Sequence, residues 1–331
     1  MNVGIIGAGL MGKKRAKALE GFNVTLLAVA DTDEQRAKEL AQTYHCSYTT
    51  DWKHIVQDET LDIIIISAIH QYLAEMAIAA IKNNKHVLIE KPAGRNLREL
   101  QKIKNVAQDH NVTIKIGYNH RFHPGILKAK ELINQGAIGK LLYIRGRYGH
   151  GGRKDYNKEW RAFKNTAGGG ELLDQGSHLI DLSRMFIGPF SSAIGYTPTF
   201  FWDMEVEDNG FALLRSPQGQ LAFLHASWTQ WKNLFSYELF GTTGELIIDG
   251  LGGSYGTETL TYYKMKPELG PPDKQTFDYP GEDQSWKLEF QNFMDAITKK
   301  TPINGSLDDA IANMMVIETI YKWNKKETRP S

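Results

Sequence analysis

Cysteine is almost absent from this sequence: Cys46 is the only one among 331 residues. No disulfide bond can form within the chain, so the fold has to be stabilised by its hydrophobic core. Cys46 has no flanking catalytic signature, and most lone cysteines are small hydrophobic residues, so we expect no nucleophilic role for it. The first residues also lack the basic region and long apolar stretch of a signal peptide. We therefore expect a cytoplasmic protein.

Charge of one sign and long apolar runs are also missing. The 39 basic and 38 acidic residues give a net charge of +1, and the basic runs are only two or three residues long. Such a balance argues against binding to nucleic acid or to an anionic membrane surface. No run approaches the roughly 18 apolar residues that a membrane span needs. The ten histidines show no metal-binding helix spacing, so we expect no metal site.

The first 121 residues alternate apolar runs with helix-forming segments. Continuous β-branched runs separated by helices of ten or more residues indicate a parallel sheet covered on both faces. We expect strands at 3–7, 24–31, 62–67, 86–90 and 112–117, and helices at 10–20, 33–44, 74–83 and 97–110. This pattern predicts an N-terminal Rossmann domain over residues 1–121.

Residues 122–331 show a different sequence pattern, which predicts a second domain of the α+β class. Short strands punctuated by turns indicate a mostly antiparallel sheet. We expect helices at 125–135, 171–186, 284–298 and 307–324, and strands at 140–146, 191–200, 210–216, 220–230, 235–240, 245–249 and 260–264. Residues 147–170 and most of 250–280 are rich in glycine, proline or aromatic residues, and we expect loops there.

A glycine-rich motif, G-x-G-x-x-G, follows the first expected strand and opens the first expected helix, with Gly7, Gly9 and Gly12 at its glycine positions. The motif alone is a weak signal, but this strand–turn–helix context is typical of a dinucleotide-binding turn. Gly7 would allow the tight turn, Gly9 the close approach of a pyrophosphate, and Gly12 close helix packing. The helix N-terminus would offer N–H groups to the phosphates.

Asp31 ends the second expected strand, 19 residues after Gly12. Its carboxylate would accept hydrogen bonds from the adenosine ribose hydroxyls and would repel a 2′-phosphate, so NAD is favoured over NADP. Arg36 could offset this charge, but on a helix face it more readily pairs with solvent or an acid. The alternatives are a Rossmann-like domain that binds FAD, a sugar nucleotide, or no ligand.

Lys91 lies directly after the expected strand 86–90 and is followed by Pro92, which ends the strand. Ligands of open parallel sheets bind beyond the carboxyl ends of the strands, so Lys91 is a candidate for the reactive end of the cofactor site. The alternative is an ordinary surface lysine.

Five motifs in this order resemble the glucose–fructose oxidoreductase / inositol dehydrogenase (Gfo/Idh/MocA) family, essentially from end to end. They are Gly7–Gly12, Glu90–Pro92, Gly117–Phe122, Gly170–Asp181 with its Asp174 and His178, and Phe240–Gly244. The resemblance implies a Rossmann domain, then a domain with a large open antiparallel sheet often used for oligomerisation. It implies NAD(P)-linked chemistry on sugars, sugar nucleotides or polyols, and we expect a homodimer or homotetramer.

The resemblance also implies that Lys91, Asp174 and His178 form the catalytic group. The spacing is compatible with this, because Asp174 and His178 would lie one turn apart on the expected helix 171–186. Oxidation of a carbinol needs a base of near-neutral pKa, which suits His178 as general base and acid. Lys91 would stabilise the developing alkoxide, and Asp174 would position substrate hydroxyls or share the proton relay. The alternative is a helix-stabilising pair.

The cofactor contacts follow from the motif and the resemblance. We expect Gly7, Gly9, Leu10, Met11, Gly12, Asp31, Ser67, His70, Glu90 and Lys91 to bind the cofactor. The sequence departs from the family pattern after the fourth strand, where Ala68–His70 replaces Thr-Pro-Asn and Leu73 replaces a common histidine. These departures leave the detailed contacts around the nicotinamide open.

The expected loop 147–170 and its flanks carry the candidate substrate residues. Aromatic rings suit the C–H face of a sugar ring, and arginines suit phosphates or carboxylates. Four arginines within residues 145–161 favour an anionic substrate, although an arginine-rich surface or subunit contact explains them equally well. We expect substrate contacts from Asn119, Arg121, Tyr148, Arg153, Trp160 and Arg161.

The sequence thus predicts an NAD-dependent dehydrogenase that moves hydride between nicotinamide and a hydroxyl-bearing carbon of a sugar, sugar nucleotide or polyol. Two alternatives remain. The first is a reductase of the same fold that acts on a non-sugar compound such as a dihydrodiol. The second is a regulatory protein that binds NAD without turnover.

Overall fold

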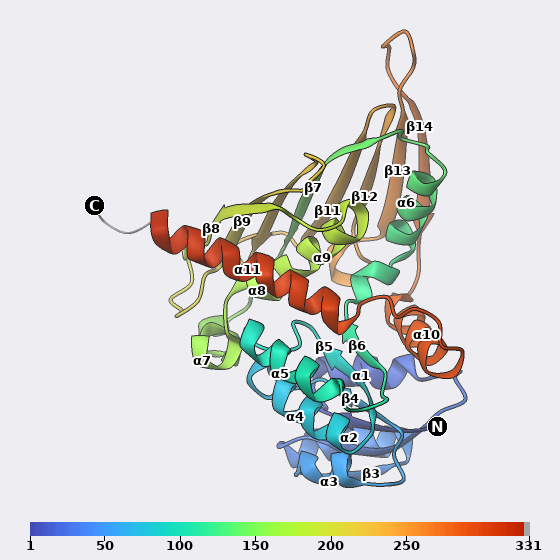
Figure 1. The fold of residues 1–331 in the computed structure, drawn as a ribbon, viewed down its shortest axis with the longest axis vertical. Coiled ribbons are helices and arrows are strands. Elements are labelled where there is room, and N and C mark those ends of the chain that lie inside the picture. The colour runs from blue at the N-terminus through green and yellow to red at the C-terminus, as the bar shows by residue number, and fades with distance from the viewer. Residues whose placement is uncertain (328–331) are drawn as a thin grey trace. The chain divides into compact units, whose positions relative to one another are not determined.

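The computed structural model describes residues 1–327, which form two compact units (Figure 1). The first unit contains Met1–Asn119, Asn165–Gly168 and Trp286–Ile311. The second contains His120–Lys164, Gly169–Ser285 and the chain from Ala312 onward. Residues 165–168 and 286–311, which follow the expected boundary at residue 121, therefore pack with the Rossmann part. Among residues 1–327, none of the helices has the length and hydropathy to cross a bilayer.

The first unit is built on a six-stranded sheet in which every strand pair is parallel. Its strands lie in the order β3-β2-β1-β4-β5-β6. Their bounds are β1 Asn2–Ile6, β2 Thr25–Ala30, β3 Ser47–Thr49, β4 Ile63–Ile66, β5 His86–Glu90 and β6 Ile114–Gly117. This order confirms the predicted Rossmann sheet and places its topological switch between β1 and β4. The short strand β3 was not predicted.

Helices cover the sheet of the first unit. They are α1 Leu10–Ala18, α2 Glu34–Tyr44, α3 Trp52–Gln57, α4 His70–Lys82, α5 Leu97–Ala107 and, from later in the chain, α10 Ser285–Thr298. Phe290 and Phe293 of α10 are buried in one core cluster with Val3, Ile5 and Val29 of the sheet. Helix α4 begins four residues before the expected start, and the short helix α3 was not predicted.

Arg15 of α1 is the largest charged side chain buried in the first unit, with 1% of its surface exposed. Its guanidinium donates to the carboxylates of Glu90 (Nε–Oε1 2.6 Å) and Glu289, and it lies over the Trp286 ring. Burial alone would lower the pKa of Arg15, but the charges of Glu289 and Glu90 raise it overall. Arg15 therefore joins α1, the end of β5 and α10 as a cation.

The second unit is built on an eight-stranded sheet in the order β14-β13-β12-β11-β7-β10-β9-β8. The strands are β7 Leu141–Gly149, β8 Ser192–Tyr196, β9 Asn209–Arg215, β10 Leu221–Ser227, β11 Leu234–Gly241, β12 Gly244–Asp249, β13 Glu258–Lys264 and β14 Asp273–Tyr279. Only the β7–β10 pair is parallel among the pairs of this sheet. The predicted, mostly antiparallel sheet is confirmed, with β14 as an extra strand in the expected loop.

Helical segments line one face of this sheet. They include α6 Pro124–Asn134, α8 Glu171–Asp174 and α9 Gly176–Ile187, with α11 Leu307–Glu327 at the end of the chain (Figure 1). The short helix α7 Lys164–Ala167 and two 3₁₀ turns, at 156–158 and 160–162, lie in the expected loop 147–170, and another 3₁₀ turn follows β6 at 119–122. The prediction of one continuous helix over 171–186 was wrong, because a turn at Gln175 separates α8 from α9. Asp174 therefore ends α8, while His178 lies in the first turn of α9.

The buried ion pairs of Arg15 give the first prediction. Replacing Arg15 by methionine leaves two buried carboxylates without their cation, which typically costs about 3–5 kcal/mol. We expect Arg15→Met to lower the free energy of unfolding by about that amount in urea titrations. The control is Arg36→Met, which breaks the exposed ion pair with Asp33 and should cost at most about 1 kcal/mol. Equal losses in the two variants would contradict the role assigned to Arg15.

Candidate functional site

The glycine turn between β1 and α1 contains two glycines that the chain itself requires. Gly7 has φ +97°, and a Cβ there would overlap the backbone of Ser67 at the end of β4. A Cβ on Gly12 would overlap the carbonyl oxygen of Gly7. Gly9 is different, because a Cβ there meets nothing within 4 Å. The space above Gly9 is the space that the G-x-G-x-x-G motif reserves for a pyrophosphate, so the turn fits a dinucleotide.

The N-terminus of α1 faces this turn without a protein cap. Gly9 is the N-cap residue and no side chain caps the helix. The first N–H groups of an α-helix have no partner inside the helix and attract anions. Leu10, at the start of α1, leaves 70% of its surface exposed although it is apolar. Both features suit a bound dinucleotide that covers the start of the helix.

Asp31 follows β2 and ties the glycine turn to the second strand. Its carboxylate accepts hydrogen bonds from the backbone N–H groups of Ala8 (2.7 Å) and Asp33 (2.9 Å). Arg36 donates to Asp33 (Nε–Oδ2 2.7 Å), as expected for an arginine paired with an acid on the helix. Because the guanidinium of Arg36 is bound by Asp33, it does not neutralise the carboxylate of Asp31. That carboxylate can accept hydrogen bonds from the ribose hydroxyls and would repel a 2′-phosphate, which favours NAD over NADP.

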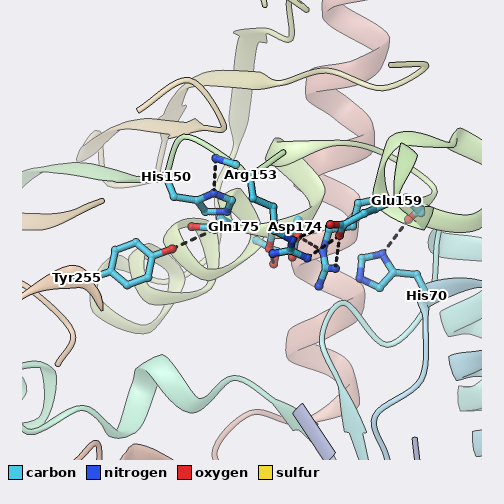
Figure 2. Close-up of polar contacts among 11 residues, drawn as sticks. His70, His150, Arg153, Glu159, Asp174, Gln175 and Tyr255 are labelled. Carbon is cyan, nitrogen blue, oxygen red and sulfur yellow. Dashed lines mark hydrogen bonds and ion pairs between the residues drawn. The ribbon is translucent and has the colours of Figure 1, made fainter. Parts of the chain in front are cut away.

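Lys91 directly follows β5, next to β4 in the sheet, and so lies beyond the carboxyl ends of the strands as expected. Its peptide bond to Pro92 is cis. The neighbouring Glu90, expected to bind cofactor, is only 7% exposed and holds Arg15. His70, at the first position of α4, has its Nδ1 2.9 Å from the carbonyl oxygen of Ala167, to which it donates (Figure 2).

In the second unit, His178 is buried in a group of rings. Its imidazole stacks on that of His120, with ring centroids 3.7 Å apart and planes 22° apart. Tyr148 packs against His120 at 5.2 Å, and Tyr255 packs against Tyr148 at 5.1 Å. His123 lies on the other side of His120 at 5.4 Å. The stack fixes the plane of the His178 ring.

A buried ion pair and a buried hydrogen bond hold the segment that carries these rings. Arg121 binds Asp181 of α9 with two hydrogen bonds, Nε–Oδ2 2.7 Å and Nη2–Oδ1 2.6 Å, and both residues are almost fully buried. His123 is 2.9 Å from Glu258. Paired and buried in this way, Arg121 orients the segment 120–123 against α9. Its predicted contact with substrate stays a prediction.

Asp174 belongs to a chain of alternating charges. Arg153 donates to Glu159 through two hydrogen bonds of 2.7 Å, and Arg161 lies 3.9 Å from Glu159 and 3.2 Å from Asp174 (Figure 2). Trp160 packs on the guanidinium of Arg161, 4.4 Å from its ring centroid. Arg145 pairs with Glu238 on β11. Three of the four clustered arginines are thus neutralised by carboxylates of the protein.

His150 is a site residue that the sequence reasoning did not select. Burial, and then the charges of Arg161 and Arg153, lower the pKa of His150, while Asp174 opposes the shift. Its Nδ1 accepts a hydrogen bond from the N–H of Gly152 (2.9 Å), so the neutral ring carries its proton on Nε2. His150 therefore presents a hydrogen-bond donor near Asp174. Gln175 and Tyr255 lie close by, 3.5 Å apart (Figure 2).

The start of α8 is anchored by Glu207. Its carboxylate accepts from the hydroxyl of Tyr321 (2.6 Å) and from the N–H of Leu172 (3.2 Å). Burial raises the pKa of Glu207 to about 6, against the lowering effect of these hydrogen bonds. Gly170 passes so close to the Glu207 backbone that a Cβ would overlap it. This contact positions α8 and with it Asp174.

The structure groups the predicted residues within each unit. Gly7, Gly9, Gly12, Asp31, Ser67 and Lys91 gather at the carboxyl edge of the first sheet, and Asn119 is buried in the same unit. In the second unit Tyr148 joins His178, while Arg153, Trp160 and Arg161 join Asp174. His120 was missed, although the Asn-His-Arg-Phe-His run drew attention to its neighbours. Within residues 1–327 no three His, Cys, Asp or Glu side chains form a group that could hold a metal ion.

Comparisons with known proteins agree with this geometry. Residues 1–118 match a family model described as "Oxidoreductase family, NAD-binding Rossmann fold", and residues 126–247 match the "GFO/IDH/MocA C-terminal domain". The chain is 27% identical over 286 residues to levoglucosan dehydrogenase of Pseudarthrobacter phenanthrenivorans, covering 75% of this chain and 73% of that protein. It is 26% identical over 264 residues to myo-inositol 2-dehydrogenase of Thermotoga maritima, covering 76% of each.

A solved structure also resembles the whole chain. It is a levoglucosan dehydrogenase in complex with NADH and levoglucosan, with a TM-score of 0.91 and 24% identity. The similarity covers 99% of this chain and 97% of the other. At this level of identity the likeness confirms the two-part fold.

The open space at Gly9 gives the second prediction. A methyl group there collides with no protein atom but fills the place reserved for the pyrophosphate, so Gly9→Ala should weaken NADH binding by about tenfold or more. The melting temperature should stay close to that of the wild type. Fluorescence titration with NADH and thermal unfolding measure the two effects.

The matched control is Gly270→Ala, since a Cβ at Gly270 also meets nothing within 4 Å. This variant should keep both its NADH affinity and its melting temperature. An unchanged NADH affinity in Gly9→Ala would show that the turn does not hold the dinucleotide.

Proposed function

Because this chain belongs to the GFO/IDH/MocA family of NAD-binding oxidoreductases, we propose that it is a dehydrogenase acting on a hydroxyl group of a neutral sugar or polyol. The observation that carries the substrate class is the pairing of Arg153 and Arg161 with carboxylates. Paired guanidinium groups have no charge left over for a phosphate or a sugar acid, but their N–H and carboxylate oxygens still bind hydroxyl groups. A sugar nucleotide is therefore the less favoured substrate. The named relatives, a levoglucosan and an inositol dehydrogenase, point to the same class.

In the proposed reaction, each of three side chains has one task. The bound nicotinamide supplies the hydride acceptor or donor. His178 takes the proton from the substrate hydroxyl during oxidation and returns it during reduction. Lys91 donates a hydrogen bond to the same oxygen and stabilises its developing negative charge. Asp174 orients a neighbouring hydroxyl group of the substrate.

We assign the remaining predicted residues in the same way. The first domain, residues 1–121 with the later segments that pack on it, would bind NAD through Leu10, Met11, Ser67 and His70 besides the glycines and Asp31. The second domain, residues 122–331, would bind the sugar through Tyr148, Trp160 and the charged network. The fold uses a single cysteine and no disulfide bond, which supports a cytoplasmic location.

The catalytic assignment gives the third prediction. Lys91→Ala and His178→Ala should each lower kcat for sugar oxidation by about 100- to 10,000-fold, because each removes a group that acts on the reacting oxygen. The formation of NADH at 340 nm with a panel of neutral sugars and polyols measures the rate. Fluorescence titration with NADH should show that both variants still bind the cofactor.

The control variant is Lys53→Ala, which removes an exposed lysine of α3 and should keep full activity. A rate close to that of the wild type in either catalytic variant would remove that residue from the mechanism. If the wild-type protein binds NADH but oxidises none of the sugars or polyols, the proposed substrate class is wrong.

We propose further that the chain forms a homodimer or homotetramer through the open face of the eight-stranded sheet. Side chains alternate along β8, β9 and β10, so that Ala193, Ala212 and Leu224 are buried while Ile194, Leu213 and Phe223 are 36%, 40% and 50% exposed. The last three are directly opposite one another across the strands. A contiguous apolar surface on a folded chain is typical of a subunit contact.

This assembly gives the fourth prediction. The double variant Leu213→Lys, Phe223→Lys places two charges in the proposed contact and should shift the protein from oligomer to monomer in light scattering after size-exclusion chromatography. Leu269→Lys, an exposed apolar position in the turn between β13 and β14, should leave the mass unchanged. A wild-type protein that is monomeric at micromolar concentration would contradict the proposal.

A further inference from the structure

Three aromatic side chains of the second unit are largely exposed to solvent. Phe200 and Phe201, in the loop between β8 and β9, are 70% and 60% exposed, and Trp231, between β10 and β11, is 67% exposed. The rings of Phe201 and Trp231 meet at 4.9 Å with an angle of 80° between their planes. We call these three residues the aromatic corner. The roles assigned above to the catalytic and sheet residues do not account for it.

The backbone under the aromatic corner is firmly held. Asp208 is fully buried, and its carboxylate accepts hydrogen bonds from the backbone N–H groups of Phe200 (2.9 Å), Phe201 (2.8 Å) and Trp202 (3.0 Å). These bonds outweigh the opposing effect of burial and lower the pKa of Asp208. A buried carboxylate is thus used to fix a turn whose side chains point into water. Such preorganised rings lose little entropy when they bind a ligand.

The two loops of the corner are also joined to each other through a buried cluster. Trp202 donates from its indole Nε1 to the carbonyl oxygen of Trp228 (3.0 Å), which precedes the loop that carries Trp231. Trp228 is fully buried with Tyr156 and Val206. The rings of Phe201 and Trp231 are therefore held in one relative position.

A series of ring contacts connects the aromatic corner to His150 of the candidate site. Ring contacts run from Phe201 to Trp202 at 5.2 Å, from Trp202 to Tyr156 at 5.7 Å, and from Tyr156 to His150 at 5.7 Å. This path of ring contacts ends at His150.

At two glycines, the backbone of the loop 147–170, which carries the candidate substrate residues, packs against the aromatic corner. We call this loop the substrate loop. A Cβ on Gly151 would lie 3.1 Å from the ring of Trp231, and one on Gly152 would lie 2.7 Å from the ring of Trp202. The substrate loop and the corner thus share one surface of the second unit. The exposed pair Arg153–Glu159 lies on the same loop and offers hydrogen-bond donors and acceptors.

We propose that the aromatic corner is a second sugar-binding subsite, which holds a glycosyl ring joined to the sugar that is oxidised. The preferred substrate is then a disaccharide or another glycoside, not a free monosaccharide. The C–H face of a pyranose packs on an aromatic ring, whose negative face attracts C–H groups, while its hydroxyl groups need polar neighbours such as Arg153 and Glu159. This inference rests on the proposed function, because it extends the substrate of the same site.

A second protein chain fits the corner less well than a sugar. A stable protein contact covers about 800 Å² on each partner, whereas the corner consists of three rings beside a charged loop. One pyranose ring is about as large as one six-membered aromatic ring, so the corner can hold one glycosyl ring. The two occupants are distinguished by experiment.

The experiment compares Phe201→Ala and Trp231→Ala with the wild type on matched sugars: glucose with maltose and cellobiose, and N-acetylglucosamine with chitobiose. The wild type should have a higher kcat/KM for at least one disaccharide than for its monosaccharide. Each variant should lose about 5- to 20-fold in kcat/KM for that disaccharide, through KM, and keep its rate on the monosaccharide. Leu269→Ala, an exposed apolar change elsewhere in the second unit, should match the wild type.

A binding measurement separates the failure of this inference from that of the proposed function. Calorimetric titration of the NADH-loaded protein with the same sugars needs no turnover. Disaccharide binding that depends on Trp231 without any oxidation would overturn the dehydrogenase assignment and keep the subsite. Activity that is equal on monosaccharides and disaccharides, or that both variants leave unchanged, would overturn the subsite and keep the dehydrogenase. A drop in molecular mass in Trp231→Ala, without loss of disaccharide binding, would show a subunit contact instead.

Discussion

The buried guanidinium of Arg15 is the interaction on which the first unit depends. It lies in the helix that follows the glycine turn, and it binds Glu90, the residue immediately before Lys91. It also binds Glu289 of α10, which lies 274 positions later in the chain. A cation with two buried carboxylates costs desolvation energy, so its value lies in fixing geometry more than in adding stability. One side chain thereby ties the helix that follows the glycine turn to the end of β5, directly before Lys91.

In the second unit, several buried charged groups fix the positions of segments in the same way. Arg121 and Asp181 fix the segment that carries His120, and Glu207 with Tyr321 fixes the start of α8. Asp208 fixes the turn under the aromatic corner. In each case a buried charged side chain holds a segment that carries a side chain of the candidate site or of the aromatic corner. Buried charges are costly unless they are fully paired, which explains why these segments have so little freedom.

Much of the fold could be predicted because local signals agreed with the final structure. The isoleucine run 63–66 became a strand buried on both faces, and G-x-G-x-x-G became the turn that its glycines require. Strand β14 was missed because its residues, Asp273–Tyr279, are mostly polar and exposed and lie beside a Gly/Pro-rich turn. It forms because β13 offers an edge to pair with, and a sequence window contains no information about that edge.

The candidate site could be predicted in its residue types but not in its pairings. Lys91, Asp174 and His178 were selected from the motifs and the family resemblance, and their catalytic roles stay predictions. The turn at Gln175 that separates α8 from α9 left no mark in the apolar periodicity. The apolar residues on either side of it, Leu172, Leu173, Leu179 and Ile180, have the spacing of one continuous helix. The stack of His120 on His178 joins residues 58 positions apart, and the partners of the arginines were equally hidden. Such contacts depend on tertiary packing, which periodicity does not encode.

These ion pairs change the class of substrate that the arginines favour. As a sequence, four arginines in residues 145–161 favour an anionic ligand, because an unpaired guanidinium is a strong phosphate site. With Glu159 between Arg153 and Arg161, and Asp174 beyond, the same residues form a nearly neutral surface of fixed donors and acceptors. A surface of that kind discriminates by the positions of hydroxyl groups, since a misplaced hydroxyl leaves a charged partner without its hydrogen bond. Charge alone selects little here, so selectivity must come from hydroxyl geometry and from the rings that border it.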